Sequence, residues 1–592
     1  MRETVHAYRV LMALSFRAAP LHATFQLVTG VLMALAFPAA AYGAKLLVDA
    51  AVAGDLARGG IATAVLALAT AAGLVIGFYY VDCVFGVFER AGGLASVRLM
   101  RLMGGTDGLA HHERPDYLDQ AHLIRERRAD LAASVNATAG VLRALVTLLA
   151  TAVLLARVHP VLLLLPAFAV VSVWLGKRAK DVDVAAEEAT AEAERLRRHL
   201  FDAGTSAAAG KELRVFRLGR VLRDRHHDVS ESVLRTRNRA TWHGAALQSV
   251  DGVVTGLAYG GAVAVVLVQA VAGAATPGDV ILVIGLASQL NNAVFAGVLY
   301  LASFLRVLTL AKRFVWLERY AARERRAPAA PAPVPERLRD GIAVSEVSFA
   351  YPDAGRPVLD RVSLHLPAGA VVALVGENGA GKTTLIKLLC GFYRPDHGRV
   401  LIDGTDLAQL PPAAWRLSAA FQDFAQLEFA VREAVGVADL PRVDDRAAVG
   451  TALSRAGATS VVDGLPQGLD TPLGTRWDGG VELSGGQWQR LALARGLMRD
   501  DPLLVVFDEP TAALDPQTEH ALFERFAAAA RTGSAHGTVT LLVSHRFSTV
   551  RMADLIVVLD AGRVCESGSH AELMAAGGLY AELYRLQSRS YR

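Results

Sequence analysis

The stretch Gly376-Glu377-Asn378-Gly379-Ala380-Gly381-Lys382-Thr383-Thr384 decides the fold of the second half of this 592-residue chain. It follows the apolar run 371–375, which is typical of a buried strand, and precedes the helical pattern 385–390. Glycines let backbone amides wrap phosphate groups, and the helix N-terminus adds positive dipole. Lys382 is placed to reach the β- and γ-phosphates, and Thr383 to hold Mg²⁺. The sequence therefore predicts a strand–loop–helix site for a nucleoside triphosphate in an α/β domain.

A second buried strand is predicted at 503–507, which is apolar throughout and ends directly at Asp508 and Glu509. Asp508 is placed to organise Mg²⁺, and Glu509 is placed to polarise the attacking water as a general base. A helix cap or a pair of surface carboxylates does not fit a position immediately after five apolar residues. These two carboxylates therefore predict that the bound nucleotide is hydrolysed.

A further anion-binding helix start is predicted at Ser484, Gly485, Gly486 and Gln487, which precede the helix-like stretch 488–497. Serine and glycines at a helix start leave backbone N–H groups that can bind anions. One nucleotide does not need two phosphate-binding helix ends in a single subunit. The pair of helix starts therefore indicates a composite site made across two subunits.

The first half of the chain has the composition of a membrane protein. The whole chain is 53% hydrophobic and 20% charged, whereas soluble chains are about 45–50% apolar and about 25% charged. A membrane-spanning helix needs about 20 mostly apolar residues, and six stretches qualify: 21–53, 60–88, 132–156, 159–177, 244–274 and 278–305. We predict a transmembrane domain over 1–325, an Ala/Pro-rich linker over 326–337 and a nucleotide-binding domain over 338–592.

Lysine and arginine concentrate in the long links that follow the second and fourth apolar stretches. Cytoplasmic loops carry an excess of these residues. We therefore expect both long links, both termini and the nucleotide-binding domain to be cytoplasmic, with the protein in the cell inner (plasma) membrane. The second link is rich in Ala, Glu and Arg, so the fourth and fifth helices should extend well into the cytoplasm. The net charge of +4 is near neutral and gives no argument for nucleic acid.

Together these residues resemble the motifs of ABC transporters, in the exporter-type class that fuses one membrane domain to one nucleotide-binding domain. The resemblance covers the whole chain. It implies an α-helical polytopic membrane domain of six helices followed by an α/β P-loop ATPase domain. It also implies ATP and Mg²⁺ as cofactors, and ATP hydrolysis coupled to transport. The stretch 376–384 is similar to the family's Walker A loop, Asp508 to its Walker B aspartate and Glu509 to its catalytic base.

The resemblance implies roles for further residues. Tyr351 is similar to the aromatic residue that stacks on adenine, and Gln422 to the Q-loop glutamine that senses Mg²⁺ and faces the membrane domain. The stretch 484–487 resembles the signature motif, which in the family contacts ATP bound to the opposite subunit. Asp515 resembles the D-loop aspartate, and His545 the switch histidine that touches the γ-phosphate. The polar segments 112–118 and 210–216 resemble the family's two coupling regions.

The function implied by the resemblance is ATP-driven export of a peptide, antibiotic or other amphipathic compound from the cytoplasm by alternating access. The stretches 421–424 and 484–490 are similar to those of exporters of lanthipeptides and related peptides. Lipid flipping, an importer built on the exporter plan and an ATP-gated regulator are the alternatives. Because no catalytic motif is degenerate, two copies could form two complete ATP sites. We therefore expect the partner in the lipid bilayer to be an identical copy, and a heterodimer with a different half-transporter is the alternative.

Polar residues inside the apolar stretches are candidates for a substrate pathway, because they are costly in a membrane. Gln289, Asn291 and Asn292 lie roughly halfway along the sixth stretch. The alternative is that they form hydrogen bonds between helices. We predict that Asn291 and Asn292, with Gln289 beside them, line the pathway of an unknown transported substrate.

Overall fold

The computed structural model describes residues 2–206, 209–324, 332–352, 354–509, 537–544 and 547–590. Within these ranges, only the backbone is described at 166, 167, 169, 170, 291, 413, 547, 548 and 587–590. The contacts of the chain divide it into two compact units. The first comprises Met1–Met103 and His122–Arg319, and the second comprises Gly104–Ala121 and Tyr320–Arg592.

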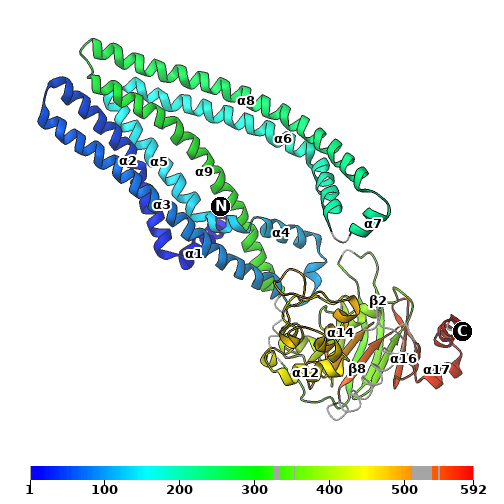
Figure 1. The fold of residues 1–592 in the computed structure, drawn as a ribbon. Helices are drawn as coiled ribbons and strands as arrows, with labels where there is room; N and C mark the ends of the chain where they lie inside the picture. The colour runs from blue at the N-terminus through cyan, green and yellow to red at the C-terminus, as the bar shows by residue number, and fades with distance from the viewer. Residues whose placement is uncertain are drawn as a thin grey trace. The chain divides into compact units, whose positions relative to one another are not determined.

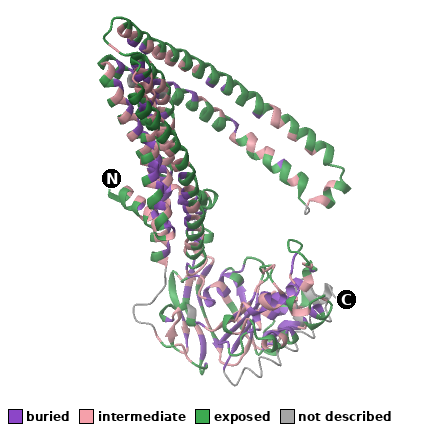
Figure 2. Ribbon diagram, turned by 60° about the vertical axis from the view of Figure 1, so that its left-hand side comes forward, coloured by how far each residue is buried: buried purple, intermediate pink, exposed green. Residues whose placement is uncertain are grey.

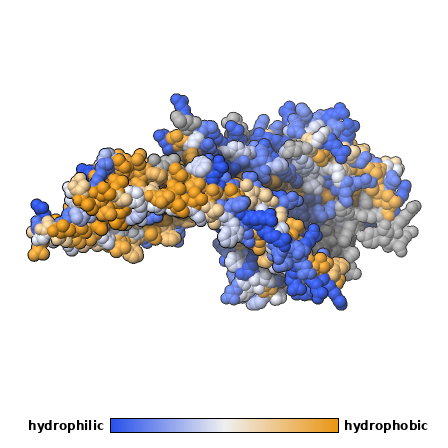
Figure 3. Space-filling view, turned by 90° about the horizontal axis from the view of Figure 1, so that it is seen from above, coloured by the Kyte–Doolittle hydropathy of each residue, from blue (hydrophilic) through white to orange (hydrophobic). Residues whose placement is uncertain are grey.

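The first unit is built from long helices (Figure 1). They are α1 (Arg2–Ala18), α2 (Pro20–Ala53), α3 (Leu56–Gly104), α5 (Ser134–Val158), α6 (Leu165–Thr205), α7 (Gly210–Val215), α8 (Gly219–Val271) and α9 (Pro277–Glu324), with α4 (Pro115–Glu126) crossing the division between the units. Figure 3 shows hydrophobic side chains gathered over these helices, whereas the second unit presents mainly hydrophilic ones. Helices that are apolar on their outer surface need lipid or further protein around them.

Five helical segments of the described residues are long and apolar enough to cross a membrane. They are Pro20–Ala53, Leu56–Gly104, Arg128–Val158, Gly219–Val271 and Pro277–Glu324. The predicted span 159–177 is not among them, so six spans are not confirmed. This stretch begins with a 3-10 turn at Pro160–Leu164, and α6 then acquires charged side chains from Lys177 onward.

The long helical extensions expected between the fourth and fifth stretches are present. Figures 1 and 2 both show α6 and α8 running side by side, with the short α7 near the turn between them. Elsewhere in this unit, a buried apolar cluster joins α5, α8 and α9 through Leu155, Val266 and Leu286. Lys45 on α2 also forms an ion pair with Asp279 on α9. The helices of this unit are therefore tied by both apolar packing and a charge pair.

The second unit contains two sheets. The first is antiparallel in the order β2-β1-β4-β5, with β1 (Gly341–Phe349), β2 (Leu359–Pro367), β4 (His397–Ile402) and β5 (Thr405–Asp406). The second has the order β10-β9-β3-β8-β7-β6, and all its neighbours are parallel except the pair β10 and β9. Its strands are β3 (Val371–Val375), β6 (Leu417–Ala420), β7 (Leu504–Asp508), β8 (Val539–Val543), β9 (Leu555–Asp560) and β10 (Arg563–Gly568). The strands predicted at 371–375 and 503–507 are therefore confirmed, with β7 shifted by one residue.

Helices pack around these sheets on three apolar cores. They are α10 (Lys382–Leu389), α11 (Val431–Gly436), α12 (Arg446–Arg455), α13 (Thr459–Asp463), α14 (Gly485–Gly496), α16 (Phe547–Val550), α17 (His570–Ala576) and α18 (Leu579–Ser590). One core joins both sheets to α10 through residues such as Val344, Leu385 and Val506. A second core gathers α11 to α14 around Trp488, and a third packs α16, α17 and α18 against β3 and β9. Figure 2 shows the strands of this unit among its most buried parts.

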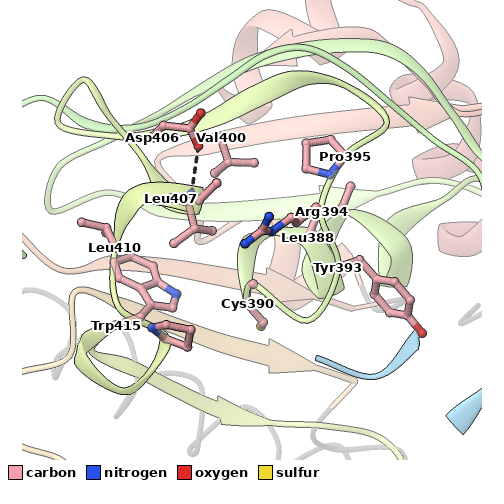
Figure 4. A pocket seen from close by; sticks show the side chains of 13 residues that line it. Leu388, Cys390, Tyr393, Arg394, Pro395, Val400, Asp406, Leu407, Leu410 and Trp415 are labelled. Carbon is pink, nitrogen blue, oxygen red and sulfur yellow. Dashed lines mark hydrogen bonds between the residues drawn. The ribbon is translucent and has the colours of Figure 1, made fainter. Parts of the chain in front are cut away.

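A small cavity lies beyond the C-terminal end of α10 (Figure 4). Its lining includes Leu388, Cys390, Leu407 and Trp415, and its volume is about 80 Å³. Pockets that hold small molecules are usually about 300–1,000 Å³, so this cavity is a packing void and not the nucleotide site. Its lining is mostly apolar but includes Arg394 and Asp406, and burial raises the pKa of the Cys390 thiol to about 12.

Candidate nucleotide-binding site

The topology of the parallel sheet brings four predicted segments to one edge. Strands β3, β8, β7 and β6 are parallel neighbours, so their carboxyl ends lie at the same edge. The loop 376–381 follows β3, Asp508 is the last residue of β7, Ser544 follows β8, and Gln422 lies two residues after β6. In open α/β sheets, ligands bind outside the carboxyl ends of the strands. The fold therefore places the predicted phosphate loop and the carboxylates where one ligand can meet them.

Three glycines of the loop after β3, at 376, 379 and 381, have a positive φ, and at two of them a side chain would also meet neighbouring atoms. Gly376 has a φ of 156° and Gly381 a φ of 98°. A Cβ atom on Gly376 would lie 2.2 Å from the carbonyl oxygen of Leu559, and one on Gly381 would lie 2.7 Å from the Leu359 side chain. Side chains are thus excluded both by conformation and by space. The loop leads directly into α10, whose N-terminus offers free amides to an anion.

Lys382 is the first residue of α10 and lies folded over its own loop. Its Nζ atom donates to the carbonyl oxygens of Gly376, at 2.8 Å, and Glu377, at 2.9 Å. Burial lowers the pKa of Lys382, while the nearby carboxylates of Glu509 and Asp508 act in the opposite direction. The structure thus brings together the lysine and both carboxylates that the sequence singled out.

The two carboxylates at the end of β7 differ in exposure and backbone. Asp508 is 6% exposed, whereas Glu509 is half-buried. The Glu509 amide donates to the carbonyl oxygen of Val543 on β8 at 3.1 Å, and its φ of 46° lies in the left-handed region. That region is unfavourable for a residue with a side chain, and such positions cluster at functional sites. The backbone therefore turns sharply where the predicted general base stands.

Tyr351 follows β1 and lies against α10. Its hydroxyl is 3.1 Å from Oγ1 of Thr384. Its ring meets Phe349 and Tyr393 edge-on, at centroid distances of 5.1 and 5.5 Å. Thr384 is buried, but the neighbouring Thr383 is exposed, so its hydroxyl is available to a ligand. The predicted adenine-stacking ring is therefore fixed to the same helix that carries the predicted phosphate and metal contacts.

The helix start predicted at 484–487 is confirmed as the beginning of α14. Ser484 Oγ accepts from the Gln487 amide at 3.3 Å, and Gln487 Oε1 accepts from the Ser484 amide at 2.8 Å. Trp488 is 2% exposed, and its indole N–H donates to Glu482 at 3.1 Å. Core residues of α10 cluster with Val506 of β7 and those of α14 with the adjacent Phe507. Because neighbouring strand residues point to opposite faces, the two helices pack on opposite faces of the parallel sheet.

The other predicted residues differ in how far the structure describes and buries them. Asp515 and His545 lie outside the described residues, as does the side chain of Asn291. Gln289 is half-buried and Asn292 is exposed on α9. Gln422 is exposed in the segment after β6.

A polar cluster among the long helices of the first unit was not predicted from the sequence. Arg143 on α5 lies between two aromatic rings, Tyr80 of α3 and Tyr300 of α9, with its guanidinium 5.1 Å from each centroid. It donates to the Tyr300 hydroxyl at 2.7 Å. No carboxylate of the described residues forms an ion pair with it. The signal in the sequence is an arginine within the apolar stretch 132–156, where a charge is costly.

The surrounding helices support this cluster. Asn136 Oδ1 on α5 accepts from Gln26 Nε2 of α2 at 3.1 Å and from the Tyr80 hydroxyl at 3.3 Å. Gly140 lies one turn before the arginine, and a Cβ atom there would lie 2.1 Å from the Tyr300 ring. The absence of a side chain at this position thus lets the aromatic ring reach α5. Four helices therefore meet around one cation.

Comparisons with known proteins agree with this architecture. A family model described as ABC transporter matches residues 359–512. The ATP-dependent lipid A-core flippase of Cupriavidus metallidurans is 45% identical over 258 residues, which cover 43% of this chain and 42% of the flippase. That of Bordetella pertussis is 37% identical over 369 residues, covering 62% of this chain and 57% of the flippase. These matches thus span about half of the relatives' length.

The solved structure of a bacterial Atm1-family ABC exporter with ATP bound is similar to nearly the whole chain. The match covers 97% of this chain and 98% of the exporter, with a TM-score of 0.74 and 24% sequence identity. At this identity the likeness concerns the fold. The nucleotide-binding region thus matches the ABC transporter family model, and the chain as a whole has the fold of this ABC exporter.

Proposed function

We propose that the chain is one half of an ATP-driven exporter that moves a peptide, antibiotic or other amphipathic compound out of the cytoplasm by alternating access. The observation that carries this proposal is the sheet edge where the loop 376–381 meets Asp508 and Glu509. The same chain carries helices that are long and apolar enough to cross a membrane. A phosphate-binding site joined to such helices suits energy-driven transport better than a soluble ATPase.

The chemistry of the site follows from its residues. Backbone amides of the loop and of the α10 N-terminus bind phosphate oxygens. Lys382 exchanges its two carbonyl contacts for phosphate contacts when ATP enters. Glu509 accepts a proton from the attacking water as general base. His545 contacts the γ-phosphate in this proposal, and Tyr351 stacks on the adenine.

The residues also fit Mg²⁺. No group of three or more His, Cys, Asp or Glu in the described part of the chain could hold a metal ion. Mg²⁺ does not need such a cage, because it is commonly bound by one or two carboxylates together with substrate phosphates and water. Thr383, Asp508 and Gln422 would hold it, and it would neutralise charge on the phosphates.

The complete site is proposed to need a second half-transporter, most simply an identical copy. The residues Ser484, Gly485, Gly486 and Gln487, with Asp515, would contact ATP bound to the partner. The predicted anion-binding start of α14 lies on a helix that packs on a different apolar core from α10, which supports this arrangement. The hairpin that carries α7 also exposes apolar side chains, with Val215 74% and Phe216 65% exposed, as expected of an interaction surface.

The proposed location is the cell inner (plasma) membrane, with the nucleotide-binding domain in the cytoplasm. Basic residues in the two long links support this orientation. The substrate pathway is proposed to include Gln289, Asn291 and Asn292 on α9.

Lipid flipping is a second candidate, and the cluster around Arg143 favours it. A cation held between Tyr80 and Tyr300 within the membrane unit suits an anionic headgroup. The Cupriavidus and Bordetella relatives, whose sequences align with this chain, are named lipid A-core flippases.

The test is transport by the purified full chain in liposomes, with the nucleotide-binding domain facing outward. Labelled amphipathic peptides and labelled phospholipids are supplied separately, with ATP. Inward movement of peptide that requires ATP, and that is lost in Glu509→Gln, is the expected result. Movement of phospholipid alone would favour flipping, and movement of neither would contradict the proposal for these substrate classes.

A further inference from the structure

The segment Gly104–Ala121 packs against the nucleotide-binding part of its own unit. The Leu109 amide donates to the carbonyl oxygen of Phe392 at 3.2 Å. Leu109 and Ala110 pack against the apolar core of the two sheets. On its other side the segment meets the end of α9, where the Tyr320 ring lies 5.0 Å from that of Tyr117 and 6.0 Å from the Arg114 guanidinium. Figure 4 shows the light-blue ribbon of this segment beside Tyr393. The segment is therefore anchored close to the aromatic cluster that holds Tyr351.

Lys387 connects this segment to the predicted adenine-stacking ring. It lies on α10, five residues after Lys382, and its Nζ atom donates to Glu113 Oε1 at 3.2 Å. The same Nζ atom lies 5.0 Å from the centroid of Tyr351 and 5.6 Å from that of Tyr393. One ammonium group thus contacts a carboxylate of the 104–121 segment and two aromatic rings of the nucleotide-binding domain.

The surroundings of Lys387 favour the charged form of its ammonium group. Burial acts to lower the pKa of Lys387, but the hydrogen bond to Glu113 and the neighbouring Tyr351 outweigh it, so the pKa is raised. The side chains of Lys387 and Glu113 are 25% and 35% exposed. Such partly exposed ion pairs contribute little to the free energy of unfolding. Stabilisation of the fold is therefore a weak explanation for the Lys387–Glu113 pair.

We infer that Lys387 is a positioning residue that couples the 104–121 segment to Tyr351. When a nucleotide base stacks on Tyr351, this coupling slows amide exchange in the segment. This inference rests on the proposed ATP site. The Tyr351 ring is held by Thr384, Phe349, Tyr393 and Lys387, and of these four contacts the lysine also pairs with Glu113. A base that fixes the ring therefore alters the cation–π contact, and with it the strength of the Lys387–Glu113 pair. Coupling of this kind is reciprocal, so the segment also influences base affinity.

Hydrogen exchange tests the inference on the full-length protein. The amides of 104–121 and of the loop 376–384 are followed separately with Mg²⁺ and saturating ATP, or with Mg²⁺ and tripolyphosphate, which has phosphates and no base. Glu509→Gln is the background, so that ATP persists. We expect both ligands to protect the loop, and ATP to slow exchange in 104–121 at least twofold more than tripolyphosphate does.

Variants separate the lysine's role from general stability. Lys387→Met keeps the aliphatic stem and should lose the response of 104–121 while the loop 376–384 stays protected. Glu113→Gln should have the same effect from the other side of the pair, and Lys387→Arg should retain the response. Arg446→Met removes the partly exposed ion pair with Asp470 in the same unit, so it serves as the matched control and should respond like the parent.

The outcomes distinguish this inference from the proposed function. An unchanged response of 104–121 in both Lys387→Met and Glu113→Gln would overturn the inference while leaving ATP binding intact. An equal response to ATP and tripolyphosphate in the parent would overturn it as well. Absence of protection at 376–384 in the parent would instead contradict the ATP site, and the inference would fall with it.

Discussion

Single residues in the phosphate loop have requirements that the sequence motif alone does not explain. The consensus spacing identifies Gly376, Gly381 and Lys382, but the structure gives separate reasons for each. Gly376 faces a carbonyl oxygen, Gly381 faces a leucine side chain, and Lys382 bonds to the loop that it closes. These contacts define the shape of the loop, and a site that is already formed lowers the entropic cost of binding.

Gly381→Ala should destabilise this loop and weaken ATP binding. The new Cβ atom would lie 2.7 Å from the Leu359 side chain at a φ of 98°, and strain of this kind costs about 1–3 kcal/mol. Thermal unfolding with and without ATP measures both effects. Gly450→Ala is the control, because that helical glycine has nothing within 4 Å and alanine should be neutral or stabilising there. Equal unfolding temperatures and equal ATP shifts for the two variants would contradict this account.

Arg143→Gln should weaken recognition of an anionic substrate within the membrane domain. Hydrogen bonds to charged groups contribute about 1.5–3 kcal/mol, so the apparent affinity for an anionic lipid should fall about tenfold to a hundredfold. ATP-dependent movement of anionic and zwitterionic labelled phospholipids in liposomes measures this, and the anionic lipid should suffer more. Arg157→Gln is the control, since Arg157 is exposed in the last turn of α5. Equal losses for both lipids would argue against an anion site at Arg143.

At the scale of helices and strands, local patterns were predictable and long-range contacts were not. The strands 371–375 and 503–507 and the start of α14 follow from apolar runs and turn residues that lie together in the sequence. The predicted span 159–177 is not confirmed, because hydropathy averaged over a window does not register the 3-10 turn at Pro160–Leu164 or the charges that follow it. The contact of Lys387 with Glu113 joins residues 274 positions apart, and no local pattern encodes it.

The N-cap of α14 should matter more for turnover than for stability. Ser484→Ala removes one hydroxyl from a capping box, which costs about 1 kcal/mol. Ser569→Ala does the same at α17, where Ser569 and Glu572 form an equivalent box, and it is the matched control. We expect both variants to lower the unfolding temperature similarly, while Ser484→Ala alone reduces ATPase activity strongly. Similar ATPase rates in both variants would contradict a role for Ser484 in the composite site.

At the scale of the whole molecule, the chain joins two units of unlike chemistry. The unit of long helices holds buried and half-buried polar groups among its apolar side chains, including Arg143 and the Lys45–Asp279 pair. The other unit is an α/β domain whose parallel strands have their carboxyl ends at the same edge of the sheet. The near-neutral net charge of +4 does not reveal this division. The division was nevertheless predictable, because both hydropathy and charge change along the sequence.

The most direct test of the central claim is the ATPase rate of Glu509→Gln at saturating ATP and Mg²⁺. The full-length protein is assayed in liposomes, with Glu582→Gln as control, because Glu582 is exposed on α18. General-base catalysis contributes about 10²- to 10⁴-fold, so the rate should fall by that factor while ATP binding is retained. Glu582→Gln should match the parent. An undiminished ATPase rate in Glu509→Gln would contradict the assignment of this sheet edge as the ATP-hydrolysing site.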